Sequence, residues 1–287
     1  MVKNKSWLLF ASITTVFWGI WGAFIEMPEK AGFPATLGYS VWALTMVPCA
    51  IVALYIIKWE LNVDWRSIFL GCVVGLTGSG GQLLLFQALR SGPAYIVFPL
   101  ISLFPILTIF LSIVFLKERG SSRQWLGIVV ALIAIAFLSY QPATGNKTPD
   151  YSWLLLSILV FILWGLQAFV MKFSNHTMNA ESIFFYMMVT AVLLIPVAFL
   201  MTDFSHPINL GFKGPYLAAI IHVLNAVGAL TLVYALRYGK AMVVVPITGL
   251  SPLITVIISL FLYGVVPGPV LATGVILAMV GIYLLSE

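Results

Sequence analysis

The sequence predicts an all-α polytopic membrane protein in which ten transmembrane helices form two inverted five-helix repeats. Hydrophobic residues make up 62% of the 287 residues and charged residues only 8%, whereas a soluble domain carries about 25% charged residues. Apolar runs of about 18 residues or more, the length of a membrane helix, recur along the whole chain. One long segment also occurs twice, and this duplication organises the rest of the sequence.

The duplicated segment starts with Ala-Leu-Arg-Ser-Gly-Pro-Ala at Ala88 and with Ala-Leu-Arg-Tyr-Gly-Lys-Ala at Ala235. The second copy follows the first by 147 residues (235 − 88) without a gap. A Trp-Gly pair at Trp18 recurs at Trp164 with an offset of 146, so the repeat extends beyond this segment. The identities that keep the register of 147 are Ala88/Ala235, Pro99/Pro246, Pro105/Pro252, Thr108/Thr255 and Ser112/Ser259.

Ten apolar spans of about 20 residues fit the chain, and each can cross a hydrocarbon core of about 30 Å at 1.5 Å per residue. The most polar connector, 141–152, separates a first five-helix repeat at 7–140 from a second at 153–285. The expected spans are 7–25, 36–57, 67–89, 93–116 and 122–140 in the first repeat, and 153–171, 181–201, 214–236, 241–263 and 267–285 in the second.

Charges and turn formers set each boundary in turn. Lysines precede the first span and no small-residue cleavage site follows it, so we expect a retained helix rather than a signal peptide. Cys49 and Cys72 both fall within spans, which favours packing over a disulfide bridge. The connectors are Glu26–Pro34, Lys58–Arg66, Arg90–Pro93 and Lys117–Arg123 in the first repeat, and Lys172–Ala180, Thr202–Gly214, Arg237–Lys240 and Gly264–Pro267 in the second.

The distribution of Lys and Arg predicts the orientation. With a cytoplasmic amino terminus, ten basic residues lie on the cytoplasmic side and four outside. The positive-inside rule therefore places both termini in the cytoplasm, with the protein in the cell (inner) membrane. Because each repeat holds five spans, an odd number, the second repeat must enter the bilayer upside down relative to the first. Such inverted repeats are found in many secondary transporters.

Paired prolines mark the fourth and ninth spans. Pro99 and Pro105 lie six residues apart, and Pro246 and Pro252 keep that spacing. Each proline leaves the carbonyl about four residues earlier without its partner, which a bilayer tolerates where protein or water satisfies the group. We therefore predict that both spans bend beside a wet cavity and offer a hinge; the alternative is a pair of ordinary kinked helices with no moving part.

A face of small and polar residues runs along the third span and its counterpart, the eighth. We predict that Gln82, His222 and Asn225 exchange hydrogen bonds with a solute. The alternative is a set of interhelical ties, worth about 1 kcal/mol each, with the glycines permitting close packing. The shared face of the third span holds Gly71, Gly75, Gly78, Ser79 and Gln82, and the register of 147 sets His222 against Gly75 and Asn225 against Gly78.

Aromatic side chains supply further candidates for solute binding. Trp18 and Trp21 share one face of the first span, and Trp164 and Gln167 share one face of the sixth. Their indoles could stack on a planar or sugar-like solute, or they could serve as packing and interfacial anchors.

Two charged residues lie close to the ends of the same two spans, Glu26 and Lys172, 146 residues apart. They therefore occupy equivalent places on opposite sides of the membrane. Each is either a gate or substrate-charge contact, or a solvated helix end.

The doubled Ala-Leu-x-x-Gly-x-Ala…Pro…Pro…Thr…Ser pattern resembles the drug/metabolite transporter superfamily, as do the Trp-Gly pairs and the Phe-Leu-Lys-Glu-Arg sequence that ends the fourth span at Arg119. Over about 7–285 the chain resembles the ten-helix branch with two EamA-type repeats. The resemblance implies a carrier for small organic solutes, with a cavity lined mainly by spans 1, 3, 4, 6, 8 and 9. Lys172 resembles a lysine that often follows the Trp-Gly pair. The second repeat departs from the pattern, because Tyr263, Gly264 and Val265 replace the basic-acidic ending.

We predict a secondary transporter that moves a small organic metabolite, such as an amino acid, sugar or related solute, by alternating access around a central cavity. The alternative is a membrane channel or lipid scramblase, although the sequence shows no repeated charged or carbonyl-rich selectivity element. The middle third of each span lacks Asp and Glu, so a carboxylate proton relay has no residue to use. His222 is the ionisable group at that depth, and its reference pKa would suit proton exchange.

An enzyme is disfavoured, because the two other histidines, His176 and His206, lie in connectors and the carboxylates lie at span edges, so they cannot converge on one catalytic set. We expect no cofactor, no metal and no nucleic-acid partner, since the basic residues behind the net charge of +5 are scattered at span ends. The expected partners are the lipid bilayer and a small-molecule solute, and a homodimer is left open.

Overall fold

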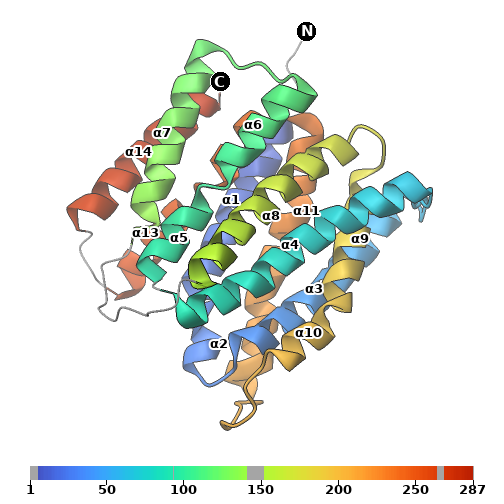
Figure 1. The fold of residues 1–287 in the computed structure, drawn as a ribbon, viewed down its shortest axis with the longest axis vertical. Helices are drawn as coiled ribbons and strands as arrows, with labels where there is room; N and C mark the ends of the chain where they lie inside the picture. The colour runs from blue at the N-terminus through green and yellow to red at the C-terminus, as the bar shows by residue number, and fades with distance from the viewer. Residues whose placement is uncertain (1–5, 93, 141–151, 264–267, 287) are drawn as a thin grey trace.

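The computed structural model describes residues 6–92, 94–140, 152–263 and 268–286, and within them the chain is helical without a strand (Figure 1). The predicted connector at 141–152 lies outside the described residues except for its last position. The first half forms α1 (Ser6–Phe24), α2 (Glu26–Lys30), α3 (Ala35–Ile56), α4 (Trp65–Ser91), α5 (Ala94–Ser102), α6 (Pro105–Leu116) and α7 (Ser122–Leu138). The second half forms α8 (Ser152–Ser174), α9 (Ala180–Leu193), α10 (Ile195–Leu200), a π-helical turn η1 (Phe212–Tyr216), α11 (Leu217–Tyr238), α12 (Ala241–Thr248), α13 (Ser251–Tyr263) and α14 (Pro269–Leu285).

Among the described residues, eight stretches are long and apolar enough to cross a membrane: Ser6–Lys30, Ala35–Ile56, Trp65–Arg90, Ile96–Leu116, Ser152–Ser174, Ala180–Leu200, Phe212–Tyr238 and Ala241–Leu262. The protein is therefore a multi-pass membrane protein. The fifth and tenth expected spans form shorter apolar helices, α7 and α14, of 17 residues each. At 1.5 Å per residue they are about 25 Å long, slightly less than a hydrocarbon core of about 30 Å.

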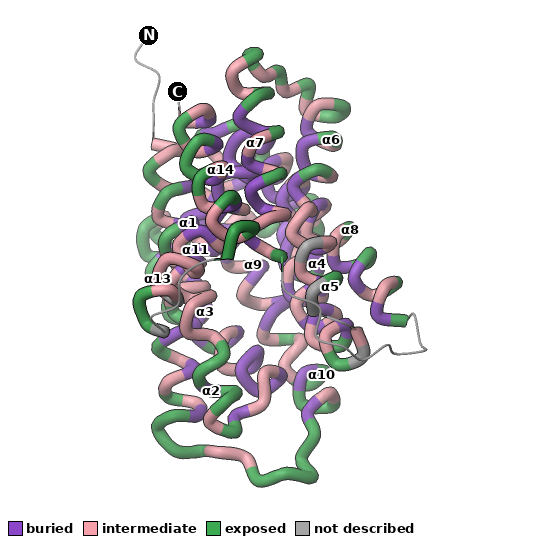
Figure 2. Tube along the Cα trace, turned by 90° about the vertical axis from the view of Figure 1, so that its left-hand side faces the viewer, coloured by how far each residue is buried: buried purple, intermediate pink, exposed green. Residues whose placement is uncertain are grey.

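The two halves of the chain interleave. α1 packs against α11 and α13, α4 packs along α8 and α9, and α7 runs beside α14 (Figure 1). Helices that follow one another in the chain, such as α3 and α4, contact each other far less. The main hydrophobic cluster draws on both halves, for example Ala11 and Met46 with Val233 and Leu285, and the buried segments lie toward the interior of the bundle in Figure 2. The core is therefore the interface between the halves.

Contacts between the halves occur in equivalent pairs, and the members of each pair lie 146 or 147 residues apart. The first pair joins α1 to α11 and α8 to α4, through an indole N–H that donates to a backbone carbonyl. The second joins α1 to α13 and α8 to α6, through a threonine hydroxyl. The bonds are Trp18 Nε1 to Asn225 O and Trp164 Nε1 to Gly78 O, both 3.3 Å, and Thr255 Oγ1 to Gly19 O at 2.8 Å and Thr108 Oγ1 to Gly165 O at 2.9 Å.

Glycines allow these helices to approach closely. Along α4, four glycines at three- and four-residue steps face side chains of α8 and α9. Because they have no side chain, these glycines let the helices pack closely. Gln82, on the same helix, lines the pocket described below. The glycine contacts are Gly71 with Tyr186, Gly75 with Thr190, Gly78 with Gln167 and Gly81 with Trp164.

The fourth and ninth spans are each broken into two helices, α5 with α6 and α12 with α13. Pro105 opens α6 and Pro252 is the second residue of α13, so the second proline of each pair lies at a break. A proline suits the start of a helix because the N–H that it lacks would have no partner there. The first proline of each pair lies within the preceding helix, Pro99 in α5 and Pro246 in α12.

Candidate functional site

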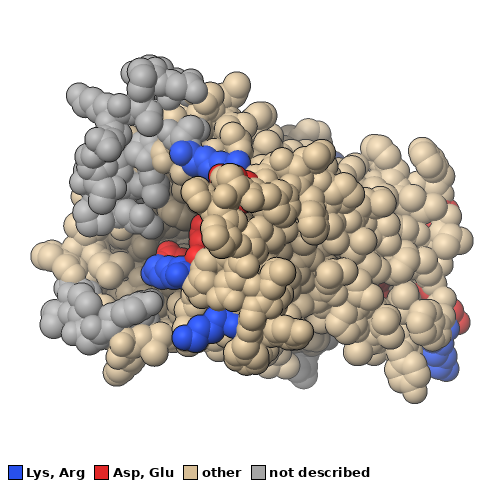
Figure 3. Space-filling model, turned by 90° about the horizontal axis from the view of Figure 1, so that it is seen from below, with Lys and Arg blue, Asp and Glu red and all other residues tan. Residues whose placement is uncertain are grey.

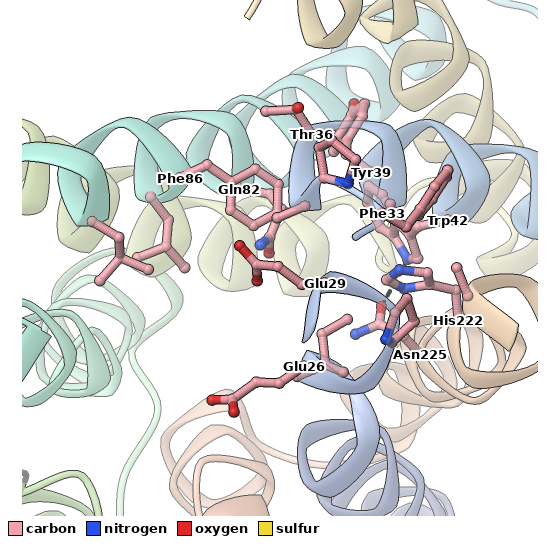
Figure 4. Close-up of a pocket in the computed structure, with 18 of the residues that line it drawn as sticks. Glu26, Glu29, Phe33, Thr36, Tyr39, Trp42, Gln82, Phe86, His222 and Asn225 are labelled. Atoms are coloured by element: carbon pink, nitrogen blue, oxygen red, sulfur yellow. Dashed lines mark hydrogen bonds between the residues drawn. The ribbon is translucent and has the colours of Figure 1, made fainter. Parts of the chain in front are cut away.

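A pocket of about 410 Å³ lies between α2, α3, α4 and α11 (Figure 4). This volume falls within the range of about 300–1,000 Å³ that is usual for small-molecule sites. Figure 3 looks onto the end of the molecule where α2 lies and shows acidic and basic side chains at the edge of a hollow. The polar lining is Glu26, Glu29, Gln82, Arg90, His222 and Asn225, and the aromatic lining is Trp21, Phe33, Tyr39, Trp42, Phe86 and Phe98.

The inner end of the pocket, formed by His222 and Asn225 of α11, offers hydrogen-bond donors. Trp21 Nε1 lies 3.1 Å from His222 Nδ1, and an indole N–H can only donate. His222 Nδ1 therefore accepts, so the ring is neutral with its proton on Nε2. His222 is only 6% exposed, and no described side chain forms a hydrogen bond with its Nε2. This N–H is available to a solute.

Asn225 is oriented in the same way. Trp42 Nε1 donates to Asn225 Oδ1 at 2.8 Å, so the side-chain carbonyl is already engaged and the amide N–H₂ group remains. Both polar residues of α11 are thus held by tryptophans of the first half, one from α1 and one from α3. The two tryptophans fix which atoms the inner end presents, and those atoms are donors without a formal charge.

The mouth of the pocket, formed by α2, carries carboxylates. Glu26 is paired with Lys30, one helical turn further on, at 2.6 Å between Oε2 and Nζ. Glu29 has no cationic side chain within ion-pair distance among the described residues. Arg90 lines the same end, and its guanidinium donates to Met201 O. In Figure 4 the carboxylate of Glu29 lies near Gln82, whereas that of Glu26 points away from the other labelled side chains.

The pocket brings together four of the predicted binding residues, Trp21, Gln82, His222 and Asn225. Of the broken spans, α5 reaches the pocket through Phe98, whereas no described residue of α12 or α13 lines it. The cavity is therefore asymmetric with respect to the two halves, being built around α11 and the first-half helices.

Three other predicted binding residues, Trp18, Trp164 and Gln167, do not line this pocket. They lie between helices instead: Trp18 is seated on Gly228 and Trp164 on Gly81, and a Cβ on either glycine would lie 2.5 Å from the indole nitrogen. Gln167 is packed against Gly78 in the same way. These side chains fill the space that glycines leave, which is the packing role considered above as the alternative.

Lys172 also lies outside the pocket, and its ammonium group contacts backbone carbonyls. It is 8% exposed, and its Nζ donates to Leu236 O at 2.8 Å and to Gly239 O at 2.7 Å. These carbonyls belong to the end of α11, where the last turn of a helix leaves carbonyls without partners and attracts cations. Lys172 therefore ties α8 to α11.

The Lys172 contact joins two helices of the second half, and other polar contacts at the same end join the second half to the first. Both carboxylate oxygens of Glu118, at the end of the fourth span, accept 2.9 Å hydrogen bonds from the backbone N–H groups of Ala241 and Met242 at the start of α12. Lys240 Nζ donates to Arg119 O at 2.6 Å. We call this set, with Lys172, the closed end. The pocket opens at the other end, beside α2.

Sequence reasoning singled out Glu26 of α2, which lines the pocket, but missed Glu29 and the wall that α3 contributes. Tyr39 and Trp42 lie in an expected span that is apolar throughout, and Glu29 lies in an expected connector. A signal was present in each case, since Tyr and Trp carry a polar atom that needs a partner when buried. Tyr39 donates to Ala191 O at 3.0 Å, and Trp42 to Asn225 as described above.

Comparison with known proteins gives a family match over both halves. The model of the EamA-like transporter family matches residues 5–140 and again residues 151–287. A solved crystal structure superimposes with a TM-score of 0.79 over 98% of this chain and 98% of that chain at 15% identity, which establishes likeness of fold alone.

Three curated relatives are similar to part of the chain. An uncharacterised protein of Methanocaldococcus jannaschii is 33% identical over 132 residues, which is 46% of this chain and 95% of that protein. CMP-sialic acid transporter 2 of Oryza sativa subsp. indica is 24% identical over 53% of this chain and 44% of that protein. An uncharacterised transporter of Archaeoglobus fulgidus is 30% identical over 50% of each. The alignments span about half the length of the last two relatives.

Proposed function

The chain belongs to the EamA-like transporter family, and from this premise we propose that it is a secondary carrier for a small organic metabolite, an amino acid, sugar or related solute, that works by alternating access around the pocket. The observation that supports the proposal is the difference between the two ends. One end of the bundle is closed by Lys172 and Glu118, while a pocket with hydrogen-bonding groups opens at the other.

Alternating access also requires helices that can move against one another within the bundle. We propose ten transmembrane helices in two inverted repeats, 7–140 and 153–285, with α7 and α14 as the fifth helix of each. The equivalent contacts support this arrangement, because Trp18 meets α11 as Trp164 meets α4, and Thr255 meets α1 as Thr108 meets α8. In inverted repeats, each repeat can adopt the conformation that the other repeat has now. That exchange would open the closed end and close the open one.

We propose that both termini are cytoplasmic in the inner membrane of the cell, from the excess of Lys and Arg on that side. Lys172, Lys240 and Glu118 then mark the cytoplasmic end, and the structure is in an outward-facing state with α2 at the outer mouth. The equilibrium between this state and its inward-facing counterpart is the property that transport depends on.

The chemistry of the inner end favours a solute with hydrogen-bond acceptors. His222 Nε2 and the Asn225 amide present donors without formal charge. When a solute acceptor is buried it loses its hydrogen bonds to water, and these two donors can replace them. A sialic acid nucleotide carries several negative charges, whereas the charged lining of this pocket holds two carboxylates, Glu26 and Glu29, and one guanidinium, Arg90. These groups favour a different solute from that named for the rice relative.

The test is transport by the purified protein in liposomes, after a thermal-shift screen of metabolites has identified a binder, since a bound solute raises the unfolding temperature by mass action. A carrier gives uptake that saturates and is accelerated by solute on the opposite side. Flux that grows linearly and shows no such acceleration would indicate the channel, and lipid exchange without solute flux the scramblase. Thr273→Leu, at an exposed position of α14 that does not line the pocket, is a control variant.

A further inference from the structure

The pocket has a polarity along its length. Its inner end presents the N–H groups of His222 and Asn225, which are fixed as donors by Trp21 and Trp42. Its mouth presents the carboxylates of α2, which are acceptors. A solute that satisfies both ends must carry an acceptor at one end and a donor at the other.

The two carboxylates at the mouth are not equivalent. Glu26 is neutralised by Lys30, on the same face of the one-turn helix. Glu29 points toward Gln82 of α4 in Figure 4 and is not in an ion pair with any described residue. The other charged group of the lining, Arg90, is engaged with a carbonyl of the segment after α10. Lys30 is close enough to influence Glu29 electrostatically, and Arg90 remains a cation at the same end. Glu29 is thus the carboxylate of the mouth that no ion pair engages among the described residues.

The walls between the two ends are aromatic. Phe33, Tyr39 and Trp42 come from the loop before α3 and from α3 itself, and Phe86 faces them from α4 (Figure 4). The faces of such rings attract cations as well as apolar groups. A monocation with a flat or apolar body therefore meets favourable groups at Glu29 and along the aromatic walls.

We propose that the pocket selects solutes with a single ammonium group, an inference that rests on the transport function proposed above. Glu29 binds the ammonium group at the mouth. The acceptor end of the solute reaches His222 and Asn225. The aromatic walls hold the body between them. Anionic solutes are disfavoured, because a carboxylate in the place of the ammonium group would face Glu29.

The test uses three compounds that share one ring and differ in charge: tyramine, which is a cation at neutral pH, tyrosol, in which a hydroxyl replaces the ammonium group, and 3-(4-hydroxyphenyl)propionate. Binding to the purified full-length protein in detergent is measured by calorimetry and by thermal shift. We expect tyramine to bind more tightly than tyrosol and the anion more weakly than both. Because the mouth is partly solvated, Glu29→Gln should weaken tyramine binding roughly fivefold and leave tyrosol binding unchanged.

Glu60→Gln is the matched control, because Glu60 is an exposed carboxylate that does not line the pocket, and it should leave all three affinities unchanged. Added salt should narrow the gap between tyramine and tyrosol in the wild type. Equal binding of tyramine and tyrosol, tighter binding of the anion, absence of binding by all three, or a preference that survives Glu29→Gln would each overturn the assignment.

Counterflow in liposomes separates this inference from the proposed transport function. Tyramine that binds through Glu29 but shows no counterflow would support the ammonium site and contradict the carrier. Counterflow of tyrosol without binding of tyramine would support the carrier and overturn the ammonium site.

Discussion

Replacing Lys172 by methionine should release α8 from α11 and so open the closed end. The variant keeps the length of the side chain but removes the two hydrogen bonds from Nζ, 2.8 Å to Leu236 O and 2.7 Å to Gly239 O. A hydrogen bond from a charged donor contributes about 1.5–3 kcal/mol. Part of that gain is offset because a buried ammonium group costs several kcal/mol in lost hydration, so we take a net of about 1–3 kcal/mol. The ratio of open to closed protein should therefore rise roughly 5- to 150-fold.

The assay labels a cysteine buried at the closed end. Met242 is fully buried beside Glu118 and Gly120, so Met242→Cys, in a background with Cys49 and Cys72 replaced by alanine, reports opening through its rate of reaction with an impermeant maleimide. Inside-out vesicles present the proposed cytoplasmic end. Lys172→Met should raise the rate in proportion to the open fraction, whereas Lys213→Met, an exposed lysine near the other end, should not. An unchanged rate in a folded Lys172→Met protein would refute the role of this contact in closure.

Three further outcomes are expected. Gly81→Ala should destabilise the protein by about 1–3 kcal/mol, because its Cβ would overlap Trp164, while Gly80→Ala, with open space around it, should not; thermal unfolding in detergent compares the two. His222→Leu and Asn225→Leu should reduce transport far more than protein abundance, measured by uptake against immunoblot, and equal losses would assign both residues to packing. Hydrogen bonds from Ser67 lower the pKa of Asp64, the N-cap of α4, so its stabilising effect is complete above its unfolded pKa of about 4 and disappears as the pH falls below it. Thermal stability should accordingly fall more steeply between about pH 5 and pH 3 in the wild type than in Asp64→Asn, and parallel curves would contradict this.

The long helices could be predicted because their signal is apolar length. The expected spans 36–57 and 153–171 correspond to α3 and α8 within a few residues. Short elements could not be predicted in the same way. α2 is one turn of polar sequence held by the Glu26–Lys30 pair, and the seventh span is split into α9 and α10 by Pro196, which its apolar pattern conceals.

The candidate site could be predicted where a polar residue interrupts an apolar span, as His222 and Asn225 do in α11. The role of Lys172 could not, because its partners are carbonyl groups, which every residue carries and no sequence pattern marks. Trp18 and Trp21 share a helix face, yet one fills a gap over Gly228 and the other lines the pocket. The surroundings of each tryptophan depend on its position along α1 relative to α11. Packing between the halves sets the relative position of these two helices.

The interleaving of the two halves has a consequence for biogenesis. When the ribosome has made only the first five helices, α4 already displays Gly71, Gly75 and Gly78, but the side chains that fill those hollows belong to α8 and α9. α1 likewise awaits α11 and α13. The nascent first half must therefore remain loosely associated near the insertion machinery until the second half has been synthesised, and two separately translated halves should assemble only when they are present together.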